Sequence, residues 1–354
     1  MVNFINFRNF QTLQTVSKLG LWFIVSLAIS LILFREFWAS LGTMLSFDWI
    51  FGQHHASPWG VLGLCGIWLY LKRKEVWKGM LESWQVRRLE TGVRKLQVGR
   101  LEGRGGEPYK PSNFISLQTF KLALLGLALV AGAILMSPSQ DFLVFQVLLA
   151  SLGVFVIFFG KAAKIPTILL GIYGLAISFP LIIEKFAELP YSMAAIKPLM
   201  WILTSLGYPL QNQGQLIYFT SASGEPISVV IIAACMGPAT MGVFLAIFAL
   251  MMLDIPLPPK KAVWLFLFGV AGTWFQSLFR LIFLLLVGYH WGEAAMRMDH
   301  AWITYIIFPS WYLLFVYIYF RQAGGKFKLQ KAKIKSRVSG VESLESGLGG
   351  IQDS

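Results

Sequence analysis

One cysteine stands where a thiol could act as a nucleophile. Cys235 lies in the run Ala-Ala-Cys-Met-Gly-Pro, between a β-rich stretch and a long apolar stretch. Gly237 and Pro238 are typical of a turn that leads into the first turn of a helix. Free backbone N–H groups at a helix start and the helix dipole stabilise a thiolate. The alternative interpretation is a small buried hydrophobic residue, which is the commoner role of a free cysteine.

A single arginine interrupts one of the longest apolar runs. Arg280 follows Phe279 and precedes the apolar residues 281–287. An arginine at the centre of a transmembrane helix costs at least about 2.5 kcal/mol on insertion scales, so it indicates a functional site by default. At about 1.5 Å per residue it lies about 28 Å along the helix from Lys261, near the opposite membrane boundary. The alternative is a side chain that snorkels to the lipid headgroups.

A histidine opens the next apolar run. His300 follows Arg297 and Asp299, and an imidazole there can exchange protons near neutral pH. An interfacial histidine without a chemical role is the alternative. The adjacent pair His54 and His55 offers two metal ligands without acidic or cysteine companions, which is weak evidence for a site. We therefore assign no metal and no cofactor.

Composition determines the class of protein. Of the 354 residues, 56% are hydrophobic and 13% are charged, which is too apolar for a soluble domain and predicts an integral membrane protein. The net charge of +13 does not indicate a nucleic-acid partner, because the cations lie between the apolar runs, as in cytoplasmic loops beside anionic lipid. The two cysteines, Cys65 and Cys235, form neither a disulfide framework nor a Cys-x-x-Cys redox pair.

Apolar stretches of roughly 20 residues predict the transmembrane helices. We expect an all-α polytopic membrane protein with about eight spans. The first span could imitate a signal peptide, but it runs into Arg35 and Glu36 without a small-residue cleavage site, which favours a retained helix. The predicted spans are 19–40, 57–71, 116–136, 142–160, 165–183, 235–253, 263–288 and 301–320.

The distribution of lysine and arginine predicts the orientation, because these residues are retained on the cytoplasmic side. With both termini in the cytoplasm, 25 cations lie in cytoplasmic segments, four lie in outer loops, and Arg280 lies within a span. This topology makes the protein a multi-pass protein of the cell membrane. It also puts Cys235, Arg280 and His300 near the outer face.

Four segments follow from this topology. An N-terminal span with its outer loop covers 1–56, and spans two to four cover 57–164, including a basic, amphipathic cytoplasmic loop at 72–116. Residues 165–320 form a membrane core, and residues 321–354 form a basic tail whose composition predicts disorder. Within the core, residues 193–206 are amphipathic, and the β-rich runs 215–220 and 227–232 predict an extracytoplasmic hairpin that leads to Cys235.

The chain resembles the exosortase and archaeosortase family in three places. Cys235 with Gly237 lies at the start of one span, Arg280 lies late in the next, and His300 lies at the head of the last. The resemblance covers about 165–320. It implies a membrane cysteine protease or transpeptidase with these three catalytic residues. The family commonly has serine where this chain has Met236, and often asparagine where it has Ser277.

The resemblance also implies the substrates and the reaction. Members cut a C-terminal sorting signal, made of a short motif, an apolar span and a basic tail, from secreted proteins, and are thought to transfer the new C-terminus to a lipid or another surface acceptor. A transporter or channel that binds an anion at Arg280 is the main alternative function. A quinone-linked thiol oxidoreductase is a further alternative, but it needs paired cysteines.

Overall fold

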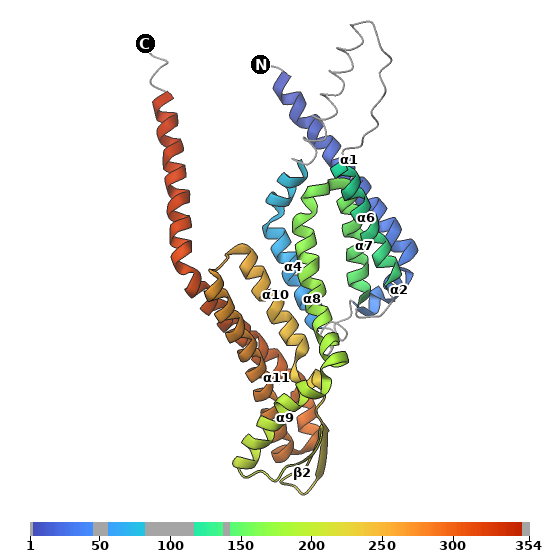
Figure 1. Ribbon diagram of the computed structural model, residues 1–354, viewed down its shortest axis with the longest axis vertical. Coiled ribbons are helices and arrows are strands. Elements are labelled where there is room, and N and C mark those ends of the chain that lie inside the picture. The colour runs from blue at the N-terminus through green and yellow to red at the C-terminus, as the bar shows by residue number, and fades with distance from the viewer. Residues whose placement is uncertain (1–2, 45–55, 82–116, 137–141, 349–354) are drawn as a thin grey trace. The chain divides into compact units, whose positions relative to one another are not determined.

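The computed structural model describes residues 3–44, 56–81, 117–136 and 142–348 (Figure 1). Most of the predicted cytoplasmic loop 72–116 lies outside the described residues, although residues 73–81 are helical. The chain divides into two compact units, Met1–Leu181 with Leu245–Ile247, and Ile182–Phe244 with Phe248–Ser354. The four segments expected from the sequence remain a prediction.

The first unit is built from apolar helices. They are α1 (Asn3–Leu33), α2 (Arg35–Met44), α4 (Ala56–Leu71), α6 (Leu117–Leu135), α7 (Leu143–Phe159), the 3-10 helix η2 (Gly160–Ala163) and most of α8 (Lys164–Phe186). Helices α6 and α7 approach closely at two glycines. A Cβ added to Gly126 would lie 2.6 Å from the Gly153 carbonyl oxygen, and a Cβ added to Gly153 would lie 2.6 Å from the Gly126 carbonyl oxygen. Trp22 on α1 donates a hydrogen bond to the carbonyl of Ser151 on α7.

The predicted first span, 19–40, is not one straight helix in the structure. Helix α1 ends at Leu33, and the chain bends by 88° into α2, which begins at Arg35. The bend falls where the apolar run meets Arg35 and Glu36, two charges whose burial in hydrocarbon is costly. Phe34 at the bend is buried.

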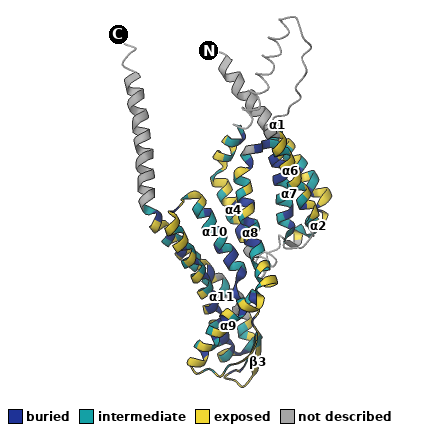
Figure 2. Ribbon diagram, viewed as in Figure 1, coloured by how far each residue is buried: buried dark blue, intermediate teal, exposed yellow. Residues whose placement is uncertain are grey.

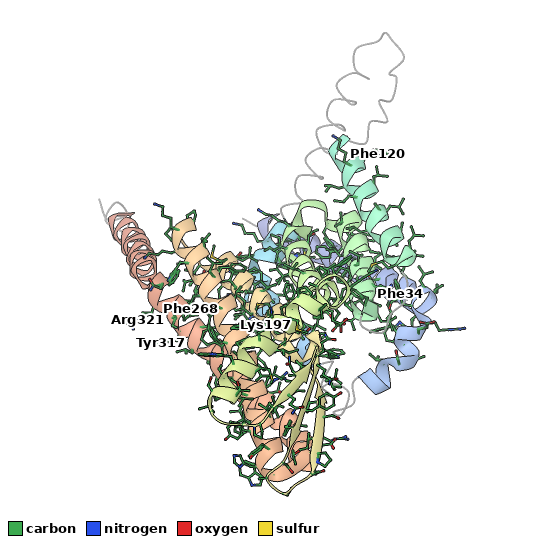
Figure 3. All side chains as sticks on the ribbon, turned by 60° about the horizontal axis from the view of Figure 1, so that its bottom comes forward. Phe34, Phe120, Lys197, Phe268, Tyr317 and Arg321 are labelled. Atoms are coloured by element: carbon green, nitrogen blue, oxygen red, sulfur yellow. The ribbon has the colours of Figure 1, made fainter. Side chains whose placement is uncertain are left out.

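The other predicted spans coincide with helices. Among the described residues, Lys164–Phe186 and Pro259–Arg297 are long and apolar enough to cross a membrane, and the bent pair α1–α2 would make a third. Pro58–Leu71, Phe120–Leu135, Leu143–Phe159 and Pro238–Asp254 are shorter apolar helices. Exposed residues run along many of the helices (Figure 2), and large apolar side chains such as Phe120 on α6 point outward (Figure 3), as expected for surfaces in contact with lipid.

Helix α11 (Pro259–Leu348) contains two antiparallel arms that meet at Gly292, whose φ of 84° interrupts the helix. Hydrogen bonds join Gln276 to Ile307 and Arg280 to Thr304. The two residue numbers of each bonded pair add up to 583 or 584, so the register is constant and centred on Gly292. We call residues 259–291 the first arm and residues 293–323 the second arm.

Helix α10 (Pro238–Asp254) packs against the second arm. Tyr312 donates to the carbonyl of Thr240, and Tyr319 donates to the carbonyl of Ile255, each at 2.7 Å. Beyond the second arm, α11 continues as a helix to Leu348, where the composition had predicted a disordered tail. Within this stretch, residues 326–337 contain five lysines and neither proline nor glycine, which favours helix.

A small antiparallel sheet precedes α10. Its strands are β1 (Gln211–Gln213), β2 (Leu216–Thr220) and β3 (Pro226–Val230), in the order β1-β2-β3. The predicted hairpin is therefore present as β2 and β3, and β1 is an additional strand. Helix α9 (Glu188–Ser205), on which Lys197 is labelled in Figure 3, covers the predicted amphipathic stretch and contributes to the same apolar cluster as the sheet.

Candidate active site

Cys235 lies in a short 3-10 turn, η3 (Ala233–Met236), between β3 and α10. The Cys235 N–H donates to the Ile232 carbonyl at 3.0 Å, and Gly237 then takes a left-handed conformation with φ 67°. Pro238 occupies the first turn of α10, as its position in the sequence predicted. The thiol therefore belongs to the turn just before the helix, not to the helix itself.

The turn separates two neighbouring side chains. Met236 is 1% exposed and belongs to an apolar cluster with Ile196 and Leu199 of α9 and Ile217 of β2. Cys235 packs against the edge of this cluster and is only half-buried. Met236, where the family that the sequence resembles commonly has serine, therefore serves packing, and it leaves the thiol at the border of the core.

Arg280 extends from the first arm to this turn. It is 6% exposed, and its Nη2 donates to the main-chain carbonyl of Cys235. Nη1 donates to Thr304 Oγ1 on the second arm at 3.1 Å, and the guanidinium carbon lies 5.6 Å from the centroid of the Phe308 ring. The arginine thus does not snorkel to a surface, and it joins three segments of the second unit.

Arg280 forms no ion pair with a carboxylate among the described side chains. Its partners in this part of the chain are a neutral carbonyl and a neutral hydroxyl. A buried cation without a counter-ion attracts an anion, because the low local dielectric strengthens the interaction. The site can therefore stabilise negative charge that develops beside the Cys235 turn.

The structure describes His300 as helical backbone at the start of the second arm, and its side chain lies outside the described part of the chain. In the register of the two arms, position 300 lies opposite position 284, one helical turn beyond Arg280. The structure thus brings Cys235 and Arg280 together, and it brings the backbone of His300 to the adjacent turn.

Sequence reasoning did not single out Thr304 and Gln276. Gln276 lies one turn before Arg280 and donates to the main-chain carbonyl of Ile307. A signal was present, since Thr273, Gln276 and Arg280 follow helical spacing and form a polar stripe in an otherwise apolar run. Ser277, at the position where the family often has asparagine, is buried and donates to the Thr273 carbonyl.

One ionisable group that packs against the same apolar cluster as Cys235 is unsuited to act as a base. Tyr191 on α9 packs against the apolar cluster, and burial raises the pKa of its phenol to about 12. The phenol therefore stays protonated near neutral pH. A proton acceptor for the Cys235 thiol has to come from another residue.

A half-buried cysteine whose main-chain carbonyl binds a buried arginine, in a mostly helical chain with membrane-length apolar helices, is the arrangement expected of a membrane-embedded cysteine enzyme. Residues 109–317, more than half of the chain, match the family model described as transmembrane exosortase. The chain therefore belongs to the transmembrane exosortase family, a family of polytopic membrane cysteine transpeptidases that process sorting signals. The resemblance seen in residues 165–320 is confirmed, and the match extends it upstream.

No curated protein and no solved structure matches this chain.

Proposed function

We propose that the protein cuts the C-terminal sorting signals of secreted proteins with Cys235 as nucleophile, and transfers the new C-terminus to a lipid or another surface acceptor. The observation that carries this proposal is the hydrogen bond from the buried Arg280 guanidinium to the carbonyl of Cys235. A costly charge in an apolar helix is directed at the residue best suited to covalent catalysis.

The reaction follows from the three side chains. The Cys235 sulfur attacks the scissile carbonyl, and His300 takes the thiol proton. Arg280, which lacks a counter-ion among the described residues, stabilises the oxyanion of the tetrahedral intermediate. The C–N bond then breaks, and His300 returns the proton to the leaving amine. An acceptor amine or hydroxyl opens the resulting thioester and releases the thiol.

Helical spacing supports the role of His300. It precedes Thr304 by four residues in one helix, and positions four apart lie on the same face. Thr304 Oγ1 accepts a hydrogen bond from Arg280, so this face of the second arm is turned toward the arginine. A proton carrier one turn along that face suits the reaction.

The excess of cations in the segments assigned to the cytoplasm supports an active site at the outer membrane face. A membrane-impermeant thiol reagent applied to intact cells tests this orientation. We expect labelling of Ser223→Cys and protection of Ser339→Cys, both in a chain without its native cysteines. The reverse pattern would put the site in the cytoplasm.

The central test is processing of a sorting-signal protein in cells that carry a Cys235 variant. We expect Cys235→Ala and Cys235→Ser to accumulate unprocessed substrate, because a serine alkoxide is far harder to form than a thiolate. Immunoblots of the membrane fraction check that each variant is present at the wild-type level. Cys65→Ala is the matched control and should process normally. Normal processing by Cys235→Ala would refute the proposal and favour the transporter.

A further inference from the structure

Two buried hydrogen-bonding atoms on residues one helical turn apart in the first arm have no partner among the described residues. Gln276 Oε1, an acceptor, and Arg280 Nε, a donor, are both shielded from solvent and unpaired among the described residues. Gln276 and Arg280 are four residues apart in one helix and therefore share a face. A buried polar group without a partner is rare in native structures and is destabilising, so the pair indicates a ligand.

The other polar atoms of both side chains are already engaged. Gln276 Nε2 donates to the carbonyl of Ile307, which can only accept, so the orientation of the amide is determined. Arg280 donates through Nη2 to Cys235 and through Nη1 to Thr304. Nη1 and Nη2 each keep a second hydrogen, whereas Gln276 Oε1 and Arg280 Nε are the two atoms of these side chains that have no partner at all among the described residues.

A free acceptor beside a free donor complements one residue of an extended peptide. In an antiparallel ladder, the N–H and the C=O of a single residue point to the same side and bond to one neighbour. A carboxylate would fit less well, because its oxygens would face the Gln276 oxygen without a hydrogen to donate.

We propose that Gln276 and Arg280 hold one extended residue of the sorting signal by its backbone, with the N–H donating to Gln276 Oε1 and the C=O accepting from Arg280 Nε. The inference rests on the proposed function, since it gives that site its substrate contact. The same guanidinium binds the Cys235 carbonyl, so the held residue lies close to the scissile bond. Because both atoms are buried, binding requires local opening of the surrounding side chains.

Amide-to-ester exchange in the substrate tests this inference. The probe is a synthetic sorting-signal peptide that the purified protein cleaves, with backbone amides replaced one at a time by esters and the scissile amide kept. An ester lacks the N–H, so at one position we expect kcat/KM to fall about tenfold, the loss of one hydrogen bond. We expect Gln276→Leu to cleave the all-amide peptide about tenfold more slowly, with no further loss from that ester.

A matched variant separates substrate binding from support of the fold. Thr273→Val removes the acceptor of the Trp311 indole N–H, a hydrogen bond that joins the same two arms at 3.2 Å one turn away. We expect this variant to keep the wild-type response to every ester. A Gln276→Leu protein that still responded to the ester would show that the N–H binds elsewhere, and would overturn the inference.

The ester series with the wild-type enzyme needs no variant and is therefore decisive if Gln276→Leu does not fold. If no ester substitution lowers kcat/KM, the inference is overturned. That is the result expected if a bound water, and not the substrate, bridges Gln276 and Arg280. Cleavage of the parent peptide in that case would leave the proposed function intact. Failure of the wild-type protein to cleave the parent peptide would refute the proposed function and this inference with it.

Discussion

The two cysteines of this chain lie in different surroundings. Cys65 lies within the apolar helix α4, is 7% exposed, and has the carbonyl of Leu169 on α8 as a weak partner at 3.9 Å. Cys235 lies in a 3-10 turn, is half-buried, and has Arg280 bound to its own carbonyl. The Cys65 thiol lies among apolar side chains. Cys235 lies at the border of the core, and a positively charged side chain binds its carbonyl.

This difference shows what a thiol needs from a fold. A thiolate requires positive charge or backbone donors nearby and a path for the substrate, and a buried thiol in apolar surroundings has neither. The residue type is the same in both places, so any difference in chemistry has to come from the surroundings. Each of the following substitutions tests one part of those surroundings.

Removing the charge beside Cys235 should have the largest effect. We expect Arg280→Ala to slow processing by about 10²–10³-fold, because a group that stabilises the oxyanion is lost. Arg280→Lys should retain part of the activity if charge matters more than the two-pronged geometry. Thr304→Val removes one of the two hydrogen-bond acceptors of the Arg280 guanidinium and should slow processing less, by about tenfold. Rates of signal processing at matched protein levels measure all three, and wild-type rates for Arg280→Ala would contradict the proposed role.

Changing the turn that holds Cys235 should have the next largest effect. A Cβ on Gly237 would lie 2.5 Å from Thr240 Oγ1 and 2.8 Å from Ser277 Oγ. The left-handed backbone there adds about 1–2 kcal/mol for a residue with a Cβ. We expect Gly237→Ala to lower the melting temperature of the detergent-solubilised protein and to impair processing.

Gly214→Ala is the control for Gly237→Ala. Gly214 has nearly the same φ, 66°, but a Cβ there would meet no atom within 4 Å. Its substitution tests backbone strain without a steric clash. Equal losses for the two variants would show that crowding around the Cys235 turn is unimportant.

Removing the other thiol should have the smallest effect. We expect Cys65→Ala to process substrate within about twofold of the wild type and to change stability by about 1 kcal/mol, a typical value for a small packing change. Labelling of the purified protein with a small maleimide should modify Cys235 and spare Cys65. Preferential labelling of Cys65 would contradict the difference drawn between the two regions.

The sequence predicted the helices well wherever an apolar run has clear ends. The predicted spans 57–71 and 142–160 match α4 (Ala56–Leu71) and α7 (Leu143–Phe159) within one residue at each end. The bend at Phe34 was missed because apolar residues resume at Phe37, directly after the charged pair Arg35 and Glu36, and hydropathy carries no information on the direction of the chain. Strand β1 was missed because Gln211–Gln213 has no apolar alternation, and it forms only by pairing with β2.

For the site, the sequence indicated the residues with an anomalous type, but not the residues whose importance depends on their contacts. A charge in an apolar run is anomalous by itself, so Arg280 was visible in the sequence and its proximity to Cys235 was predicted from topology. Gln276 and Thr304 are ordinary polar residues in helices, and their importance depends on the register of the two arms. That register is set by the break at Gly292 and by side-chain packing, neither of which a single sequence specifies.

The hairpin around Gly292 also bears on how the chain enters the membrane. Synthesis proceeds from the N-terminus, so the Cys235 carbonyl already exists when Arg280 leaves the ribosome, and Thr304 follows only 24 residues later. Arg280, the charge that is hardest to insert, is thus synthesised after one of its hydrogen-bond partners, Cys235, and before the other, Thr304. The first arm bears the cost of its arginine only until the second arm arrives, so we expect rapid pairing of the arms to favour insertion of the chain.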